Sequence, residues 1–279
     1  MYEFRDTNEY AYPAEVSLQT IVNGVNLDKA LTGFTTLSVH GRELLGKNVE
    51  TTEFRKIKVG QKTRTYVQRN KSKSQGSSFL GSRMPTRSIK IEYSLKAKDN
   101  TDFREQFELL NYYLDAAEAE IVFTDDLKFK WIATLASVEE VSGNGNWVKG
   151  AFELTCSDSF KIARDEEIFT FADKGIFKKN TYYPVRLEQA EIELKVAINK
   201  IILKNFTNGQ RIILDGNFVP GQKIILNFVD GTIYSGTSQD LIKSLDITSD
   251  FEEFTILYND VISVNALGNV SFYYREVRL

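Results

Sequence analysis

Residues 88–98 show the most regular alternation of apolar and polar positions in the chain. Every second residue there is apolar or aromatic, and the residues between are lysine, glutamate or serine. Successive residues of a β-strand point to opposite faces of the sheet, so this pattern predicts a half-buried strand. The predicted buried face consists of Ile89, Ile91, Tyr93, Leu95 and Ala97.

The period lengthens in residues 101–117, which follow that strand. Apolar residues recur there at the spacing of one helix face, namely Phe103, Phe107, Leu110 and Leu114. The pattern predicts an amphipathic α-helix, and it is the only strong helix signal in the chain. Thr101 or Asp102 is expected to cap the first turn by accepting hydrogen bonds from its free N–H groups.

Strand patterns return after the helix, at residues 120–124, 129–135 and 151–156. From residue 185 onward, short apolar runs alternate with turn signals such as Asn208-Gly209 and Asp230-Gly231. Short strands at regular spacing without a helix are typical of a β-sandwich. The strands expected in this part of the chain include residues 192–198, 241–247 and 254–257.

These patterns predict a mainly β protein with two domains. An α+β domain with one helix is expected at residues 1–165, with a projecting β-hairpin arm at about residues 58–87. A β-sandwich is expected at residues 166–279, after a charged boundary near residues 164–167. The chain has 279 residues, of which 42% are apolar or aromatic. Both domains can therefore bury a core without a disulfide or a structural metal.

The composition narrows the chemistry that the chain can perform. Cys156 is the only cysteine, so the sequence allows no intramolecular disulfide and no cysteine-based zinc site. Its position in phase with Phe152 and Leu154 indicates a buried apolar residue rather than a nucleophile. His40 is the only histidine, and it is interpreted as a polar residue before a turn. Neighbouring carboxylates in a strand face opposite ways and cannot straddle one bond. We therefore expect no enzymatic activity, no cofactor and no metal.

The charge is distributed unevenly. The formal net charge is −3, but residues 54–91 contain eleven cations and no acidic residue. A basic segment on an acidic body favours a charge-complementary protein contact, since nucleic-acid binding fits poorly with an acidic chain. A solvated loop is the alternative for this segment. The residues expected at a subunit interface are Lys62, Arg64, Arg69, Lys71, Lys73, Arg83 and Arg87.

The first residues contain no apolar core of a signal peptide, and no run approaches the length of a membrane span. We therefore expect synthesis in a cytoplasm and no membrane contact.

Taken in order, several segments resemble one known family. They are the GRELL turn at residues 41–45, the strand at 87–95, the helix at 102–114, the strands at 121–125 and 129–135, the FELTCSDSF segment at 152–160 and the YYPV segment at 182–185. Their order and spacing are similar to the distal tail proteins of phages and prophages of Gram-positive bacteria that have long, non-contractile tails. Family members often have proline where this chain has Ser159.

The resemblance implies a ring-forming N-terminal domain, a galectin-like C-terminal β-sandwich and an arm that serves as a belt around the neighbouring subunit. Such proteins form a homo-hexameric hub at the distal end of the virion tail. The implied partners are the tail tube protein, the tail-associated tip protein and receptor-binding or peripheral baseplate proteins, with DNA only passing through the ring.

A carbohydrate-binding module that acts in host adsorption is the alternative function. It would use aromatic residues of the C-terminal domain to stack on sugars. The candidates are Phe206, Phe218, Tyr234, Tyr258, Tyr273 and Tyr274. Because Tyr273 and Tyr274 are neighbours on one strand, at least one of the two is expected to pack into the core.

Overall fold

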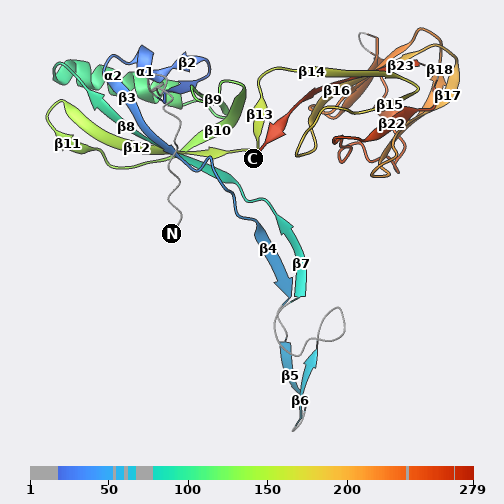
Figure 1. Cartoon of the computed structure of the whole chain (residues 1–279), viewed down its shortest axis with the longest axis horizontal. Helices are drawn as coiled ribbons and strands as arrows, with labels where there is room; N and C mark the ends of the chain where they lie inside the picture. The colour runs from blue at the N-terminus through green and yellow to red at the C-terminus, as the bar shows by residue number, and fades with distance from the viewer. Residues whose placement is uncertain (1–17, 53–54, 60–61, 67–77, 237–238, 267) are drawn as a thin grey trace, which may run out of the picture. The chain divides into compact units, whose positions relative to one another are not determined.

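The computed structural model describes residues 18–52, 55–59, 62–66, 78–236, 239–266 and 268–279 (Figure 1). The chain divides into two compact units. Unit 1 comprises residues 1–124, 132–159 and 279, and unit 2 comprises residues 125–131 and 160–278. In both units most described residues outside loops belong to antiparallel strands, which confirms the mainly β fold class.

Unit 1 is built on one antiparallel sheet in the order β2-β1-β9-β10-β12-β8-β3. Two helices accompany it, α1 (Leu27–Ala30) and α2 (Asn100–Leu114) (Figure 1). The short strand β11 (Ser142–Asn144) pairs with β12. The path strands are β1 (Thr20–Val22), β2 (Val25–Asn26), β3 (Phe34–His40), β8 (Arg87–Lys96), β9 (Ala119–Phe123), β10 (Phe129–Val138) and β12 (Trp147–Cys156).

The alternation in β8 predicts its buried face correctly. Ile89, Ile91, Tyr93 and Leu95 are at most 1% exposed. The register sets Phe152 of β12 opposite Ile91, and residues directly opposite in an antiparallel pair share a face. Burying each aliphatic or aromatic side chain of this kind contributes about 1.5–3 kcal/mol. The centre of unit 1 is therefore the β8–β12 pair, which runs over ten paired positions.

Helix α2 confirms the predicted helix but begins and ends earlier. Its N-cap is Asp99, whose Oδ1 accepts hydrogen bonds from the backbone N–H groups of Thr101 and Asp102 at 2.8 and 2.9 Å. The predicted caps, Thr101 and Asp102, thus lie inside the first turn. Asp102 instead accepts the backbone N–H of Lys98, the residue before the cap, through Oδ2 at 2.8 Å.

Unit 2 contains two antiparallel sheets. One has the order β14-β23-β16-β19-β20-β21, and the other has the order β15-β22-β17-β18. The strands of the first sheet are β14 (Glu167–Ala172), β16 (Arg186–Leu194), β19 (Lys223–Asn227), β20 (Thr232–Ser235), β21 (Gln239–Asp240) and β23 (Gly268–Arg275). Those of the second are β15 (Lys174–Ile176), β17 (Ile198–Asn205), β18 (Arg211–Phe218) and β22 (Val261–Val264). Outside both, β13 (Lys161–Ala163) pairs with β24 (Val277–Arg278) and with the first residues of β10.

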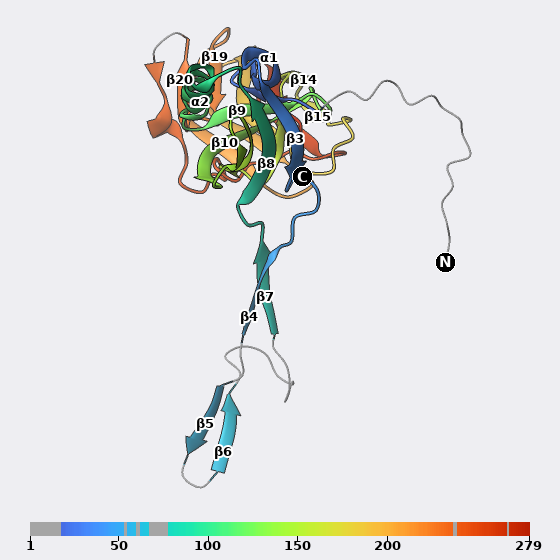
Figure 2. The same ribbon diagram turned by 90° about the vertical axis from the view of Figure 1, so that its left-hand side faces the viewer.

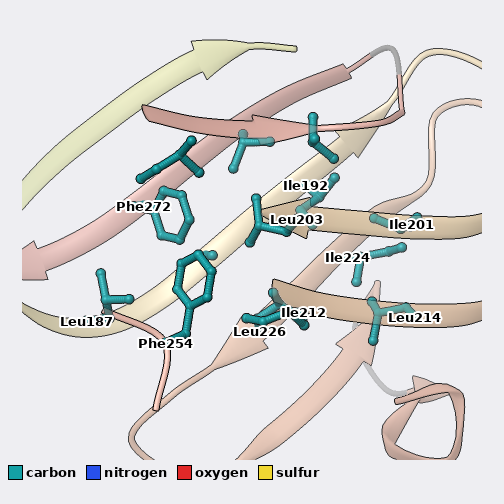
Figure 3. Close-up of a cluster of buried hydrophobic side chains, with 14 of the residues drawn as sticks. Leu187, Ile192, Ile201, Leu203, Ile212, Leu214, Ile224, Leu226, Phe254 and Phe272 are labelled. Atoms are coloured by element: carbon teal, nitrogen blue, oxygen red, sulfur yellow. The ribbon is translucent and has the colours of Figure 1, made fainter. Parts of the chain in front are cut away.

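The core of unit 2 lies between these two sheets. Figure 3 shows Ile192 and Phe272 from the larger sheet facing Leu203 and Ile212 from the smaller one. All four side chains are at most 1% exposed. This arrangement is a two-layer β-sandwich, as the sequence predicts.

Three strand predictions in unit 2 are wrong in detail. The run at residues 192–198 contains the end of β16 at Leu194 and the start of β17 at Ile198, with a turn between. The run at 241–247 contains a short 3-10 helix, η1 (Ile242–Ser244). Residues 254–257 form no strand, although Phe254 and Ile256 are buried. In the last two runs, buried apolar side chains reach the core from segments outside the ladders, so burial imitates a strand pattern.

Two ribbons within residues 48–83 form sheets separate from the main sheet of unit 1 (Figure 2). They overlap the arm expected at about residues 58–87 but begin earlier, and Arg87 belongs to β8. In the first ribbon, β4 (Asn48–Thr52) pairs with β7 (Ser78–Arg83). In the second, β5 (Arg55–Val59) pairs with β6 (Lys62–Tyr66).

Among the described residues, no helix is both long and apolar enough to cross a membrane.

Candidate assembly site at the arm and its base

The residues predicted for a subunit interface fall on several parts of the arm. Lys62 and Arg64 belong to β6, where the register sets them opposite Val59 and Ile57. Arg83 ends β7. Three further cations, Arg69, Lys71 and Lys73, lie outside the described residues. The interface role of these cations stays a prediction.

Arg87 differs from the other predicted interface residues because it is buried in its own unit. It is the first residue of β8 and is 1% exposed. Its Nη1 donates to the backbone carbonyl of Gly41 at 2.6 Å, and its Nε donates to that of Ser159 at 3.1 Å. A longer contact of 3.4 Å joins Nη1 to the carbonyl of Glu43. Burial lowers the pKa of the guanidinium. Arg87 therefore holds together the chain segments from which the arm starts and to which it returns.

A sequence signal for this role exists in the alternation of β8. Arg87 is in phase with Ile89 and Ile91, whose side chains are buried, and not with Lys90, which is partly exposed. The register also sets Arg87 opposite the buried Cys156. An arginine on the buried face of a strand must find hydrogen-bond acceptors, because a buried charge without partners is costly.

Two further features close the base of the arm. Gly41 has φ of +90°, and a Cβ at this position would lie 2.1 Å from the backbone oxygen of Ser88. Only glycine fits such a close approach in the left-handed region. The segment that returns from the arm is held at Pro85, whose backbone carbonyl accepts a hydrogen bond from the hydroxyl of Ser159 at 2.5 Å.

The residues considered for catalysis do not form a reactive group. The Nε2 of His40 lies 3.0 Å from the hydroxyl of Ser38, which donates to Glu92 at 2.7 Å. In a hydrolytic triad the histidine stands between the serine and the carboxylate, whereas here the serine does. Cys156 is fully buried, as predicted, and burial raises the pKa of its thiol to about 11. Among the described residues, no group of three or more histidine, cysteine, aspartate or glutamate side chains could hold a metal.

The six aromatic residues proposed for sugar stacking divide into three groups by burial. Phe218 and Tyr274 are 3% and 4% exposed and belong to the core of unit 2, so Tyr274 is the inward neighbour of Tyr273. Phe206 and Tyr258 are exposed. Tyr234 and Tyr273 are partly buried, and the hydroxyl of Tyr273 donates to Glu191 at 3.2 Å. The stacking set is thus smaller than the sequence suggests.

One family model of known proteins matches part of the chain. Residues 44–156 match the family model of the phage tail protein RIFT-related domain. The matched span includes the arm, α2 and strands β8 to β12. The match over residues 44–156 confirms the resemblance found in the sequence.

Among solved structures, the chain is similar to the Dit (gp 19.1) protein of SPP1, described as a paradigm of the hub adsorption apparatus in phages that infect Gram-positive bacteria. The TM-score is 0.73 at 15% identity, over 94% of this chain and 99% of that one. This likeness shows a shared fold through both units. The baseplate of phage P2 in its activated conformation with Ca matches with a TM-score of 0.47 at 11% identity, over 93% and 98% of the two chains. No curated protein matches the sequence.

Proposed function

We propose that the protein is a structural component of a phage tail tip: a homo-hexameric hub that joins the tail tube to the tip and receptor-binding apparatus and has no enzymatic activity. Each subunit places its basic arm against the acidic body of the next. Because the arm and the surface that it contacts differ, the contact is heterologous, and heterologous contacts that close form rings. The phage tail domain match and the shared fold with a phage hub protein support this role.

The observation that carries the proposal is the construction of the arm. Two ribbons stand in sheets of their own, in a segment (residues 48–83) with nine cations and only two acidic residues, and Arg87 anchors their base. A protein without partners gains little from such a segment, since a two-stranded ribbon buries little apolar surface by itself. A subunit contact gives the ribbons a surface to cover, and permanent assemblies often bury more than about 2,000 Å².

The register supplies a clean test. Thr52 and Ser78 are the last paired residues of the first ribbon, so residues 53–77 can be replaced by Asn-Gly, a two-residue hairpin turn. The variant keeps β4 and β7 and removes β5, β6 and eight of the cations. We expect the full chain to sediment as a ring and the shortened chain to sediment as smaller species. The circular dichroism spectrum of the shortened chain should still show the strands of both units, as in the wild type.

Two results would count against the proposal. If the full chain stays monomeric at high concentration, it does not form a ring by itself. If the shortened chain forms rings of wild-type stability, the arm does not hold the ring together. As a control for lost positive charge elsewhere on unit 1, the exposed cations Lys47 and Lys98 are replaced by glutamate. This pair of substitutions should leave the ring intact.

A further inference from the structure

A row of cations crosses the outer face of the smaller sheet in unit 2. The register sets Lys174 of β15 opposite Ser263 of β22, Ser263 opposite Lys204 of β17, and Lys204 opposite Arg211 of β18. Residues directly opposite in antiparallel pairs share a face, so these four lie in one line across all four strands. The alternate residues, such as Leu203 and Ile212, are buried.

These cations are not neutralised by ion pairs. Within the described part of the chain, Lys174, Lys204 and Arg211 have no carboxylate within 4.0 Å, although neighbouring Lys200 pairs with Asp215 at 3.1 Å. Asp250, beside Arg211, accepts the backbone N–H of Arg211 at 2.9 Å rather than its guanidinium. Like charges directly opposite each other destabilise a sheet. The arrangement therefore costs stability and offers a site for a negative partner.

An aromatic ring adjoins the row. The ammonium groups of Lys174 and Lys204 lie 5.7 and 4.8 Å from the centre of the Phe206 ring, which is 54% exposed. Phe206 donates its backbone N–H to the carbonyl of Val261, and Val261 pairs with Ile176 of β15. Ile176 is 45% exposed. Cations and large apolar side chains thus form one surface. A partner that fits it carries acidic and aromatic residues together.

The chain contains one segment with that chemistry outside the described residues. Residues 1–17 contain four acidic residues and one arginine, and their aromatic residues are Tyr2, Phe4, Tyr10 and Tyr12. We propose that the surface formed by Lys174, Lys204, Arg211, Phe206 and Ile176 binds residues 1–17 of a second copy of the chain. Acidic side chains face the cation row, and an aromatic ring packs against Phe206.

The test uses a fluorescein-labelled peptide of residues 1–17, added to the full chain and followed by fluorescence anisotropy. Saturable binding is expected, with an affinity that falls at about 0.5 M salt because charge contacts are screened. Lys204→Glu should weaken binding about tenfold or more. This substitution places opposite charges across β17 and β18, so it relieves the repulsion with Arg211 and does not threaten the fold. Phe206→Ala should weaken binding about three- to tenfold.

The control is Lys243→Glu, which makes the same charge change at an exposed lysine of η1 and should leave the affinity unchanged. A peptide whose four aromatic residues are replaced by serine should bind about as weakly to the wild type as the normal peptide binds to Phe206→Ala. The proposal is overturned if no saturable binding occurs, if Lys204→Glu and Lys243→Glu behave alike, or if a single-stranded oligonucleotide outcompetes the peptide. Because the peptide is added separately, the result does not depend on whether the chain forms a ring.

Discussion

Replacing Arg87 by methionine tests the anchor at the base of the arm. Methionine keeps much of the volume but donates no hydrogen bond. Hydrogen bonds to charged groups contribute about 1.5–3 kcal/mol each, and two of the three contacts of Arg87 are short. Gly41 is exposed, so water can replace the guanidinium there, whereas the carbonyl of the half-buried Ser159 loses a partner. The release of a buried charge offsets part of the loss. We expect unit 1 to lose about 2–4 kcal/mol of stability.

Hydrogen–deuterium exchange read by mass spectrometry measures this loss in each unit separately. A tenfold change in an equilibrium corresponds to about 1.4 kcal/mol, so the opening equilibrium of β8 should rise about thirtyfold to nearly a thousandfold. Exchange in β16 of unit 2 should stay at the wild-type rate and serves as the internal reference. Arg87→Lys should be intermediate, because an ammonium group lacks the planar fork that reaches two carbonyls in fixed directions.

The matched control is Lys90→Met, which removes a cation from the opposite face of the same strand. Lys90 pairs with Glu139 at 2.6 Å at the surface, and such pairs contribute little. If Arg87→Met and Lys90→Met change exchange in β8 equally, the anchor is no stronger than a surface ion pair and the reasoning fails.

Three further predictions concern unit 1. Gly41→Ala should destabilise unit 1 more than Gly24→Ala in chemical denaturation. Both glycines have positive φ, but only at Gly41 would a Cβ meet a neighbouring backbone. Equal losses of stability in the two variants would contradict this. Asp99→Ala should cost about 1 kcal/mol, measured as accelerated exchange in α2, because a helix cap is lost. The folded-state pKa of Cys156 is raised to about 11 from an ordinary 9.0, so stability should decline as the pH rises from about 9 to 11. A Cys156→Val variant should make that decline smaller, and thiol reagents should label the native chain only as fast as it opens.

The sequence predicts the central strands well because their apolar and polar residues alternate strictly and each strand has a paired strand on both sides. Strand β8 lies between β3 and β12, so every second side chain is buried, and the pattern records this directly. The sandwich of unit 2 also follows from its short strands and turn signals. The errors at residues 241–257 have one cause, since the apolar side chains there enter the core without a hydrogen-bonded ladder.

The arm shows where composition and pattern disagree. Composition places Arg87 with the other cations of the arm, whereas its phase in β8 places it in the core, and the phase prevails. The residues that accept its hydrogen bonds, Gly41 and Ser159, are far apart in the sequence and carry no pattern of their own. Contacts to backbone carbonyls depend on the path of the chain rather than on residue type, so sequence reasoning cannot find them.

The anchor and the ribbons together explain how a basic arm can serve an assembly. A two-stranded ribbon is marginally stable alone, so its direction must be set at its base and its faces must be covered by a partner. Arg87 and Ser159 set the base by fixing both the outgoing and the returning segment to the sheet of unit 1. In the proposed ring, an arm held in this way would meet the neighbouring subunit with less conformational freedom to lose, and a smaller entropy loss strengthens binding without any added contact. The Arg87→Met variant should therefore weaken subunit association even though it changes no surface that a neighbour could touch. If analytical ultracentrifugation shows that Arg87→Met associates as strongly as the wild type, the anchor plays no part in subunit association.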